Sequence, residues 1–245
     1  MCIDCGCAAP HDHDHTHDHQ GRTVNIEENL LAKNDRLAKR NRELFQDREM
    51  FVLNLVSSPG SGKTSILERT LSDLKTRYGF AVLEGDQQTA NDAHRIAATG
   101  VAVEQINTGT GCHLDAHMVG HGLEPFDLDV VDLLMIENVG NLVCPATFDL
   151  GEDHKVVVLS VTEGEDKPLK YPDMFRAADV MIINKTDLLP HLNFDLEQCR
   201  AYARQVNPNL EVFELSCQSG EGMDAWYTWL AGGVAVKRGK EQVTI

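Results

Sequence analysis

The sequence has no long uninterrupted apolar stretch and carries far fewer positive than negative side chains. No window approaches the roughly 18 consecutive apolar residues of a membrane-spanning helix, so no membrane span is predicted. The beginning of the chain also lacks an apolar signal segment, and we therefore expect a cytoplasmic location. Against 38 acidic residues stand only 22 lysines and arginines, for a formal charge of -16. Such a field repels phosphates and argues against nonspecific binding to nucleic acid or to an anionic membrane.

Enough apolar residues remain to build a sizeable core. The 245 residues are 42% hydrophobic, which suits one large α/β domain with an appendage. The chain holds seven cysteines, and in a cytoplasmic protein these indicate metal or redox chemistry rather than structural disulfides. Three of them, Cys2, Cys5 and Cys7, lie together near the beginning. The other four are scattered: Cys112, Cys144, Cys199 and Cys217.

An apolar run followed by a Gly-rich turn predicts a phosphate-binding loop. Five of the six residues 51–56 are apolar, which is typical of a buried parallel strand. Residues 57–64, SSPGSGKT, match G-x-x-x-x-G-K-[ST] except that Ser57 replaces the first Gly. Backbone N–H groups of such a loop surround a phosphate, with a helix following, here predicted over 62–77. The alternative is an ordinary Ser/Gly turn. The nucleotide contacts would come from Gly60, Ser61, Gly62, Lys63, Thr64 and Ser65.

Within this loop, two side chains have specific chemical roles. Lys63 would reach the β- and γ-phosphates as a cation, and we expect it to act in catalysis. The hydroxyl of Thr64 would ligate the Mg²⁺ that bridges these phosphates. The loop therefore predicts a P-loop NTPase fold, an α/β protein with a mostly parallel doubly wound sheet flanked by helices.

Acidic residues follow two further predicted strands. Residues 80–84 predict a strand that leads to Asp86, and residues 130–137 predict one that ends at Glu137. The carboxyl ends of the strands are where doubly wound sheets bind ligands, so Asp86 or Glu137 would organise Mg²⁺ and the attacking water. The alternative is capping of the next helix, which suits the nearby Asp92 better than Asp86.

The beginning of the chain is rich in metal-ligating side chains. Residues 1–20 combine the C-x-x-C-x-C cluster with five histidines that alternate with Asp or Thr. Such a segment cannot bury a core, so we expect disorder without metal. Nickel, zinc and copper all suit thiolate and imidazole ligands. An affinity tag and an inert solvated tail are the alternatives. We expect a metal-binding tail over 1–24, a helical segment over 25–49 packed on the main domain, and a nucleotide-binding domain over 50–245.

A second metal site is suggested where Cys112 and His113 follow a predicted strand over 101–106. We expect these residues at the start of a helix, whose N-terminus lowers the pKa of a thiol. Beyond Glu137, Gly140 has the spacing of a backbone sensor of the γ-phosphate, and Cys144 follows on the same segment. A metal near Cys112 would thus be tied to the nucleotide state through Cys144. On the same helical face we expect His117 and His121.

The tetrapeptide Asn184-Lys185-Thr186-Asp187 predicts guanine as the base. The carboxylate of Asp187 accepts hydrogen bonds from guanine N1–H and the 2-amino group, and the stem of Lys185 covers the ring. Adenine leaves that carboxylate unmatched, a difference that supplies selectivity on the order of 10⁴. A polar loop with Ser216, Cys217 and Gln218 is placed to contact the base edge.

Further strands are expected over 156–161, 179–183 and 210–215, and a last helix is expected over 223–230.

Taken together, these motifs resemble the hydrogenase nickel-incorporation GTPases, the HypB family, over nearly the whole chain. The likeness is carried by residues 1–7, 57–64, 137–145 and 184–187, and Ser57 resembles the form that this family uses. It implies a Mg²⁺-dependent GTPase that cycles between GTP and GDP and delivers nickel to the large-subunit precursor of [NiFe] hydrogenase. A HypA-type nickel chaperone and a nucleotide-dependent homodimer are the implied partners.

The resemblance also implies particular metal ligands. A tight nickel site would lie at Cys2, Cys5 and Cys7. A weaker nickel or zinc site would use Cys112, His113 and Cys144. Dimerisation across the nucleotide face would bring Lys170 to the nucleotide and pack Leu188 and Leu192 at the interface. The five alternating histidines suggest added nickel storage or buffering.

Three other readings remain open. One is a passive nickel-storage protein with a vestigial nucleotide site, and another is a urease-type nickel GTPase, which the cluster of Cys2, Cys5 and Cys7 argues against. An ATP-dependent relative would leave Asp187 idle. Because no catalytic Gln or arginine finger is evident near the acids, we expect slow turnover.

Overall fold

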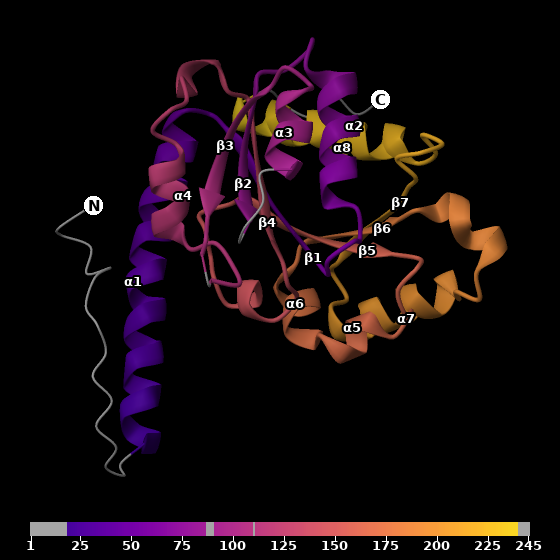
Figure 1. Ribbon diagram of the computed structural model, residues 1–245, viewed down its shortest axis with the longest axis horizontal. Helices are drawn as coiled ribbons and strands as arrows, with labels where there is room; N and C mark the ends of the chain where they lie inside the picture. The colour runs from indigo at the N-terminus through magenta and orange to yellow at the C-terminus, as the bar shows by residue number, and fades with distance from the viewer. Residues whose placement is uncertain (1–18, 87–90, 110, 240–245) are drawn as a thin grey trace.

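The computed structural model describes residues 19–86, 91–109 and 111–239, and it describes side chains from residue 29 onward. The cysteine cluster and the histidine run predicted to bind metal lie outside the described side chains. Seven strands alternate with helices along the described chain (Figure 1). In order the elements are α1 (His19–Asp47), β1 (Phe51–Ser57), α2 (Lys63–Leu74), β2 (Phe80–Asp86), α3 (Asn91–Ala97), β3 (Ala102–Asn107), α4 (Ala116–Gly122), η1 (Leu128–Val130), β4 (Leu133–Gly140), η2 (Cys144–Ala146), β5 (His154–Ser160), α5 (Lys167–Lys170), α6 (Pro172–Ala177), β6 (Val180–Asn184), η3 (Thr186–His191), α7 (Leu196–Val206), β7 (Glu211–Glu214) and α8 (Met223–Lys237).

The strands form one sheet in the order β3-β2-β4-β1-β5-β6-β7. Every neighbouring pair is parallel, so the predicted doubly wound fold is confirmed. The apolar runs of the central strands fit this arrangement, because a parallel sheet is covered by helices on both faces. Since all strands run the same way, their carboxyl ends meet along one edge, where β1 leads to the phosphate loop.

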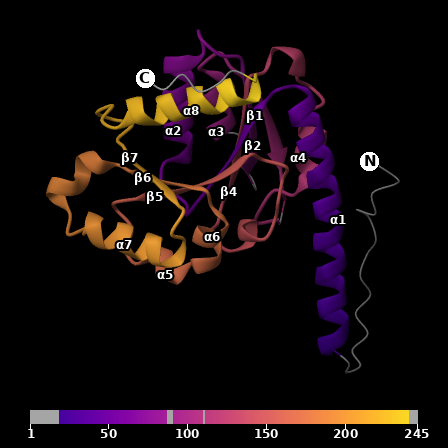
Figure 2. The ribbon, with the colours of Figure 1, turned by 180° about the vertical axis from the view of Figure 1, so that it is seen from behind.

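Side chains that alternate along the strands fill two sides of the sheet. One side packs on α2, α3 and α8, with Leu67 and Trp226 among the buried residues. On the other side, α1 and α4 cover β2 and β4, and α6 and α7 cover β5 and β6. Figure 2 shows α8 and α2 on one side of the sheet and α5, α6 and α7 on the other, with α1 beside α4 at the right of the view. No helix in the described part of the chain is long and apolar enough to cross a membrane.

The first helix departs from the prediction in its limits and in its buried face. We expected it over 25–49, whereas α1 covers His19–Asp47. Two apolar side chains of this helix differ in burial, because Phe45 is buried whereas Leu30 is 57% exposed. The face that packs on the domain carries two buried asparagines, Asn34 and Asn41, together with the buried Ala38 and Phe45. A search for apolar side chains overlooks such a face, because its buried asparagines form hydrogen bonds to other segments.

Two predicted boundaries are wrong in ways that bear on the site. The strand predicted over 130–137 begins only at Leu133, because residues 128–130 form a 3-10 turn capped by Asp127. Helix α4 begins at Ala116, where the Asp115 carboxylate accepts a hydrogen bond from the Met118 N–H at 2.8 Å. Cys112 and His113 therefore lie in the loop before the helix and not at its N-terminus.

Candidate nucleotide and metal sites

The phosphate loop joins β1 to α2 in the expected place. Gly60 has φ 79° and Gly62 has φ 99°, conformations that favour glycine. Gly62 also has no space for a side chain, since a Cβ there would lie 2.4 Å from Asn184 Nδ2. The buried ammonium of Lys63 donates to Ser57 Oγ at 2.8 Å, and burial lowers its pKa. Ser57, the departure from the general motif, thus provides a hydrogen-bond acceptor for this lysine.

A cavity of about 500 Å³ opens above this loop. It brings together Lys63, Thr64, Asp86 and Glu137, the residues predicted to bind phosphate and Mg²⁺. The Thr64 hydroxyl donates to Glu137 Oε1 at 2.8 Å, and Glu137 is almost fully buried. Hydroxyl and carboxylate oxygens are the ligands that Mg²⁺ prefers, so this donor set fits a magnesium ion bound with a phosphate.

Glu84, which the sequence analysis did not single out, lies next to this acid. It pairs with Glu137 across β2 and β4 and is only 3% exposed. Burial and the charge of Glu137 raise the pKa of Glu84 to about 8, and burial raises that of Glu137 to about 7. Among the described residues, neither Glu84 Oε2 nor Glu137 Oε2 has a hydrogen-bond partner. This pair therefore favours a neighbouring cation. The signal in the sequence was an acid at the end of an apolar strand.

An arginine also lines the acidic cavity. Arg95 of α3 donates to Asp92 Oδ1 at 3.0 Å and to Ser65 Oγ at 3.3 Å, and it pairs with Glu68. Asp92 lies in the first turn of α3. The sequence analysis did not single out this arginine, and its ion pairs with Asp92 and Glu68 leave the prediction of no arginine finger untested. Sequence spacing could not reveal Arg95, because α3 brings it to the cavity only through the packing of the fold.

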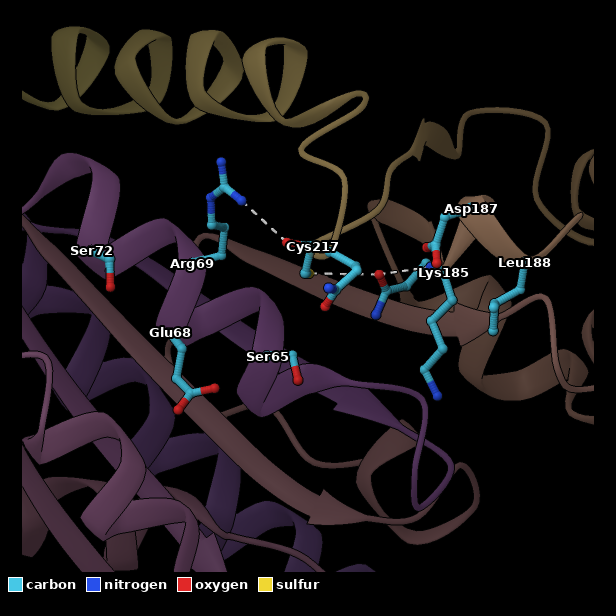
Figure 3. A pocket seen from close by; sticks show the side chains of 10 residues that line it. Ser65, Glu68, Arg69, Ser72, Lys185, Asp187, Leu188 and Cys217 are labelled. Atoms are coloured by element: carbon cyan, nitrogen blue, oxygen red, sulfur yellow. Dashed lines mark hydrogen bonds between the residues drawn. The ribbon is translucent and has the colours of Figure 1, made fainter.

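A second cavity, of about 540 Å³, adjoins the loop on its other side (Figure 3). Side chains from α2 line one side of it, and Lys185, Asp187 and Leu188 line the other (Figure 3). Ser216 does not line this cavity, but the other predicted base-binding residues do, together with Ser65 of the phosphate loop: Asn184, Lys185, Asp187, Cys217 and Gln218. The two cavities share Ser65 and Lys185, so they form one continuous nucleotide-sized cleft.

The base side of the cleft is held by hydrogen bonds. Asn184 Nδ2 donates to the Ser61 carbonyl at 2.9 Å, and Lys185 Nζ donates to the Gly60 carbonyl at 2.7 Å. Lys185 has φ 63°, an uncommon conformation for a residue with a side chain. The buried Ser216 hydroxyl donates to Asp187 Oδ1. This arrangement fixes Asp187 at the cavity wall.

Two more residues brace the loop without belonging to any recognised motif. Glu163 Oε1 accepts hydrogen bonds from Ser61 Oγ at 2.7 Å and from the Ser160 N–H at 3.0 Å. Lys167 lies 3.0 Å from Glu163 Oε2 and donates to Ser58 Oγ at 3.0 Å.

On the base side of the cleft, Cys217 Sγ lies 3.6 Å from Asn184 Oδ1. Burial raises the pKa of that thiol to about 11, so it is neutral at pH 7.

Cys112, His113 and Cys144 come together outside the cleft. Their ligand atoms all lie within 4.8 Å of one another, the one such group of three or more among the described residues. Cys112 Sγ is 3.6 Å from His113 Nδ1, and the His113 ring packs 3.9 Å from that of Phe148. Two sulfurs and an imidazole nitrogen are a donor set for nickel or zinc.

The electrostatics of this cluster differ from our expectation. The pKa of Cys112 is raised by a hydrogen bond with Cys144 and by burial, whereas we expected a helix N-terminus to lower it. Burial lowers the pKa of His113 and so favours the neutral imidazole that binds metal. His117 and His121 lie on α4 with their rings 4.5 Å apart. They are not grouped with His113, which precedes the helix.

The residues predicted at a dimer interface all lie on the outside of the chain. Lys170 is exposed and pairs with Asp166 at 2.7 Å, and Leu192 is 38% exposed. Leu188 is half-buried at the edge of the base cavity. Their contact with a second copy stays a prediction.

Comparison with known proteins gives a consistent result. The family described as "CobW/HypB/UreG, nucleotide-binding domain" matches residues 51–214. The hydrogenase maturation factor HypB of Azotobacter vinelandii is 66% identical over 211 residues, which cover 86% of this chain and 70% of the relative. HypB of Helicobacter pylori, crystallised in complex with nickel, is 40% identical with a TM-score of 0.79 over 87% of this chain and 99% of that one. HypB of Archaeoglobus fulgidus is 41% identical with a TM-score of 0.78 over 83% of this chain and 99% of that one.

Proposed function

The chain belongs to the CobW/HypB/UreG family, and within it to the hydrogenase maturation factors HypB, and on this premise we propose that it couples GTP hydrolysis to nickel insertion. The GTP would be hydrolysed to GDP and phosphate. The nickel would be handed to the large-subunit precursor of [NiFe] hydrogenase, with a HypA-type nickel chaperone as a further partner. The protein would act in the cytoplasm as a nucleotide-dependent homodimer.

One observation carries this proposal: a single short segment reaches both sites. Glu137 of β4 accepts from Thr64 of the phosphate loop, and the same segment continues to Cys144 in the metal cluster. Between them, Asn141 Nδ2 donates to the Cys112 carbonyl at 3.3 Å. A change at the γ-phosphate that moves this segment would therefore reach the nickel ligands.

The residues of the cleft have distinct roles in hydrolysis. Lys63 would exchange its bond with Ser57 for the β- and γ-phosphates, and Asp187 would accept the N1–H and 2-amino protons of guanine. Thr64, Asp86 and Glu137 would hold the Mg²⁺, which neutralises charge on the phosphates. Asp86 or Glu137 would orient the attacking water. Gly140 lies against Pro59 of the loop, where its backbone would sense the γ-phosphate.

Nickel is the cargo in this scheme. Cys112, His113 and Cys144 would bind it weakly or hold zinc, while Cys2, Cys5 and Cys7 would form the tight site. Turnover would be slow. Arg95 is already paired with Asp92 and Glu68 in the structure, so it is not free to act on a phosphate without rearrangement.

A phosphate-release assay tests the catalytic half of the proposal. The chain should hydrolyse GTP in the presence of Mg²⁺ but not ATP, and Lys63→Ala should abolish the activity. Complementation of a deletion strain tests the biological half. Failure of hydrogenase maturation with Lys63→Ala supports the proposal, whereas intact maturation would indicate passive nickel storage. A strain in which urease fails and hydrogenase does not would favour the urease-type alternative.

A further inference from the structure

Helix α1 contacts both segments that carry the cluster of Cys112, His113 and Cys144. Asn34 Oδ1 accepts from the Ala116 N–H at 2.9 Å, and Asn34 Nδ2 donates to the Asp149 carbonyl at 2.7 Å. Two turns further on, Asn41 Nδ2 donates to the Ala116 carbonyl at 2.8 Å and to the Leu150 carbonyl at 3.0 Å. Ala116 begins α4 just after Cys112 and His113, and residues 149 and 150 follow the segment of Cys144. Each asparagine thus bridges the same two segments.

Close packing reinforces these hydrogen bonds. Gly151 has φ 95°, and a Cβ there would lie 2.7 Å from the Ala38 carbonyl oxygen. Arg42 pairs with Asp149 at 2.7 Å. The segment after Cys144 is therefore pressed against the backbone of α1, and no side chain larger than that of glycine fits at position 151.

On the side away from α1, the same segments are joined through the sheet. The Leu114 N–H donates to Asn138 Oδ1 at 3.0 Å, and Asn138 Nδ2 donates to Asn54 Oδ1 at 3.2 Å. Asn54 Nδ2 then donates to Glu152 Oε1 at 3.0 Å, and Glu152 Oε2 accepts from the Leu150 N–H at 2.6 Å. Asn41 joins Ala116 to Leu150 from the side of α1, and the bonds through Asn138, Asn54 and Glu152 join the same two segments through the sheet. Together these hydrogen bonds form a closed ring.

The energetic weight of this ring comes from burial. Asn34 is 5% exposed and Asn41 is 7% exposed. Removing such an amide leaves buried backbone groups without that hydrogen-bond partner, which destabilises the position of both loops. Both loops therefore depend on α1 for their position, although Asn34 and Asn41 are not ligands of the cluster themselves.

We propose that Asn34 and Asn41 are positioning residues for nickel at Cys112, His113 and Cys144, an inference that rests on the metal site of the proposed function. The amides hold the two loops at the separation that lets the three ligand atoms converge. In the sequence, this helix follows the cysteine-rich beginning of the chain.

Nickel titration of the full-length chain carrying Cys2→Ala, Cys5→Ala and Cys7→Ala tests this role. The thiolate-to-nickel charge-transfer band reports on Cys112 and Cys144 and is blind to the histidine run. In this background, Asn41→Ala should weaken nickel binding by about tenfold or more, as loss of a supporting hydrogen bond does at other metal sites, and should alter the band. Asn34→Asp keeps the acceptor for the Ala116 N–H but loses the donor to Asp149, so a smaller loss is expected.

The matched control is Arg48→Ala in the turn that directly follows α1, which removes a contact with Asp129 away from the cluster. It should leave nickel affinity and the band unchanged. GDP affinity should be unchanged in all variants, which shows that the domain is folded. Unchanged nickel affinity and band in both asparagine variants would overturn the positioning role. No band in the background chain, even before Asn34 or Asn41 is changed, would overturn the proposed metal site itself.

Discussion

The nucleotide cleft and the metal cluster are built in different ways. The cleft lies at the carboxyl ends of β1, β2, β4 and β6, and its key side chains are buried: Lys63, Glu84, Glu137 and Asn184. The cluster lies on two loops, and its three ligands are only half-buried. Strand ends fix the cleft through the sheet itself, whereas the cluster depends on hydrogen bonds from α1 and from buried asparagines.

This difference explains what each region can do. A cleft fixed by strands can hold donors and acceptors ready for a ligand of defined shape. A cluster on two loops changes its geometry when either loop moves, which suits a site that must take up and release its metal. The segment from Glu137 to Cys144 contributes Glu137 to the cleft and Cys144 to the cluster.

The largest effect should follow from changing the base-binding carboxylate. Asp187→Asn replaces an acceptor by a donor opposite guanine N1–H and the 2-amino group. The preference for GTP over ATP should fall by a factor on the order of 10⁴. Competition binding with both nucleotides measures it. An unchanged preference would show that Asp187 does not contact the base. The cleft would then not be a guanine-nucleotide site.

Loss of the phosphate-binding lysine should have the next largest effect. Lys63→Ala removes a charged hydrogen bond worth about 3 kcal/mol, so GTP affinity should fall about 100-fold. A fluorescent GTP analogue gives the dissociation constant. Lys75→Ala is the control, because that side chain bonds to the Thr99 carbonyl outside the cleft. Equal affinities for the wild-type chain and the Lys63 variant would refute the phosphate loop.

In the cluster, a single ligand change should weaken metal binding without touching the cleft. Cys144→Ala removes a ligand, so in the chain that lacks the first three cysteines it should lower nickel affinity by more than the roughly 10- to 100-fold that loss of a supporting contact costs. GDP affinity should stay the same. Chelator competition gives the first value and calorimetry the second. Nickel affinity that survives the substitution would remove Cys144 from the site.

The smallest effect concerns the buried acid beside Glu137. The pKa of Glu84 is raised from 4.5 to about 8, so folding takes up a proton between these pH values, and the free energy of unfolding falls as the pH rises through that window. Glu84→Gln cannot ionise. The nucleotide-free variant should match the wild type near pH 5 and exceed it by about 1–3 kcal/mol near pH 9, or several degrees in Tm.

Thermal unfolding across this pH range measures the difference. The control is Glu43→Gln, which changes an exposed side chain of α1. Parallel curves for the wild type and Glu84→Gln would show that the acid pair is not strained in the nucleotide-free protein.

The cleft could be predicted from the sequence, and the support of the cluster could not. The phosphate loop and Asn184 to Asp187 follow apolar strands directly, so local patterns place them at one edge of a parallel sheet. Glu84 ends a strand in the same way and was within reach of that reasoning. Arg95, Glu163 and the asparagines of α1 reach their partners only through tertiary packing, and no spacing in the chain signals them. The loop position of Cys112 was missed because the Asp115 cap outweighs the helical pattern before it.

The central claim is that the two regions communicate through the segment that they share. The most direct test is a nickel titration against a competing chelator, in the chain carrying Cys2→Ala, Cys5→Ala and Cys7→Ala, with GDP or with a non-hydrolysable GTP analogue and Mg²⁺. We predict one site that shows the thiolate-to-nickel charge-transfer band, that is lost in Cys144→Ala, and whose nickel affinity differs between the two nucleotide states. Equal affinity in both states would contradict the account and leave the cleft and the cluster as independent sites on one fold.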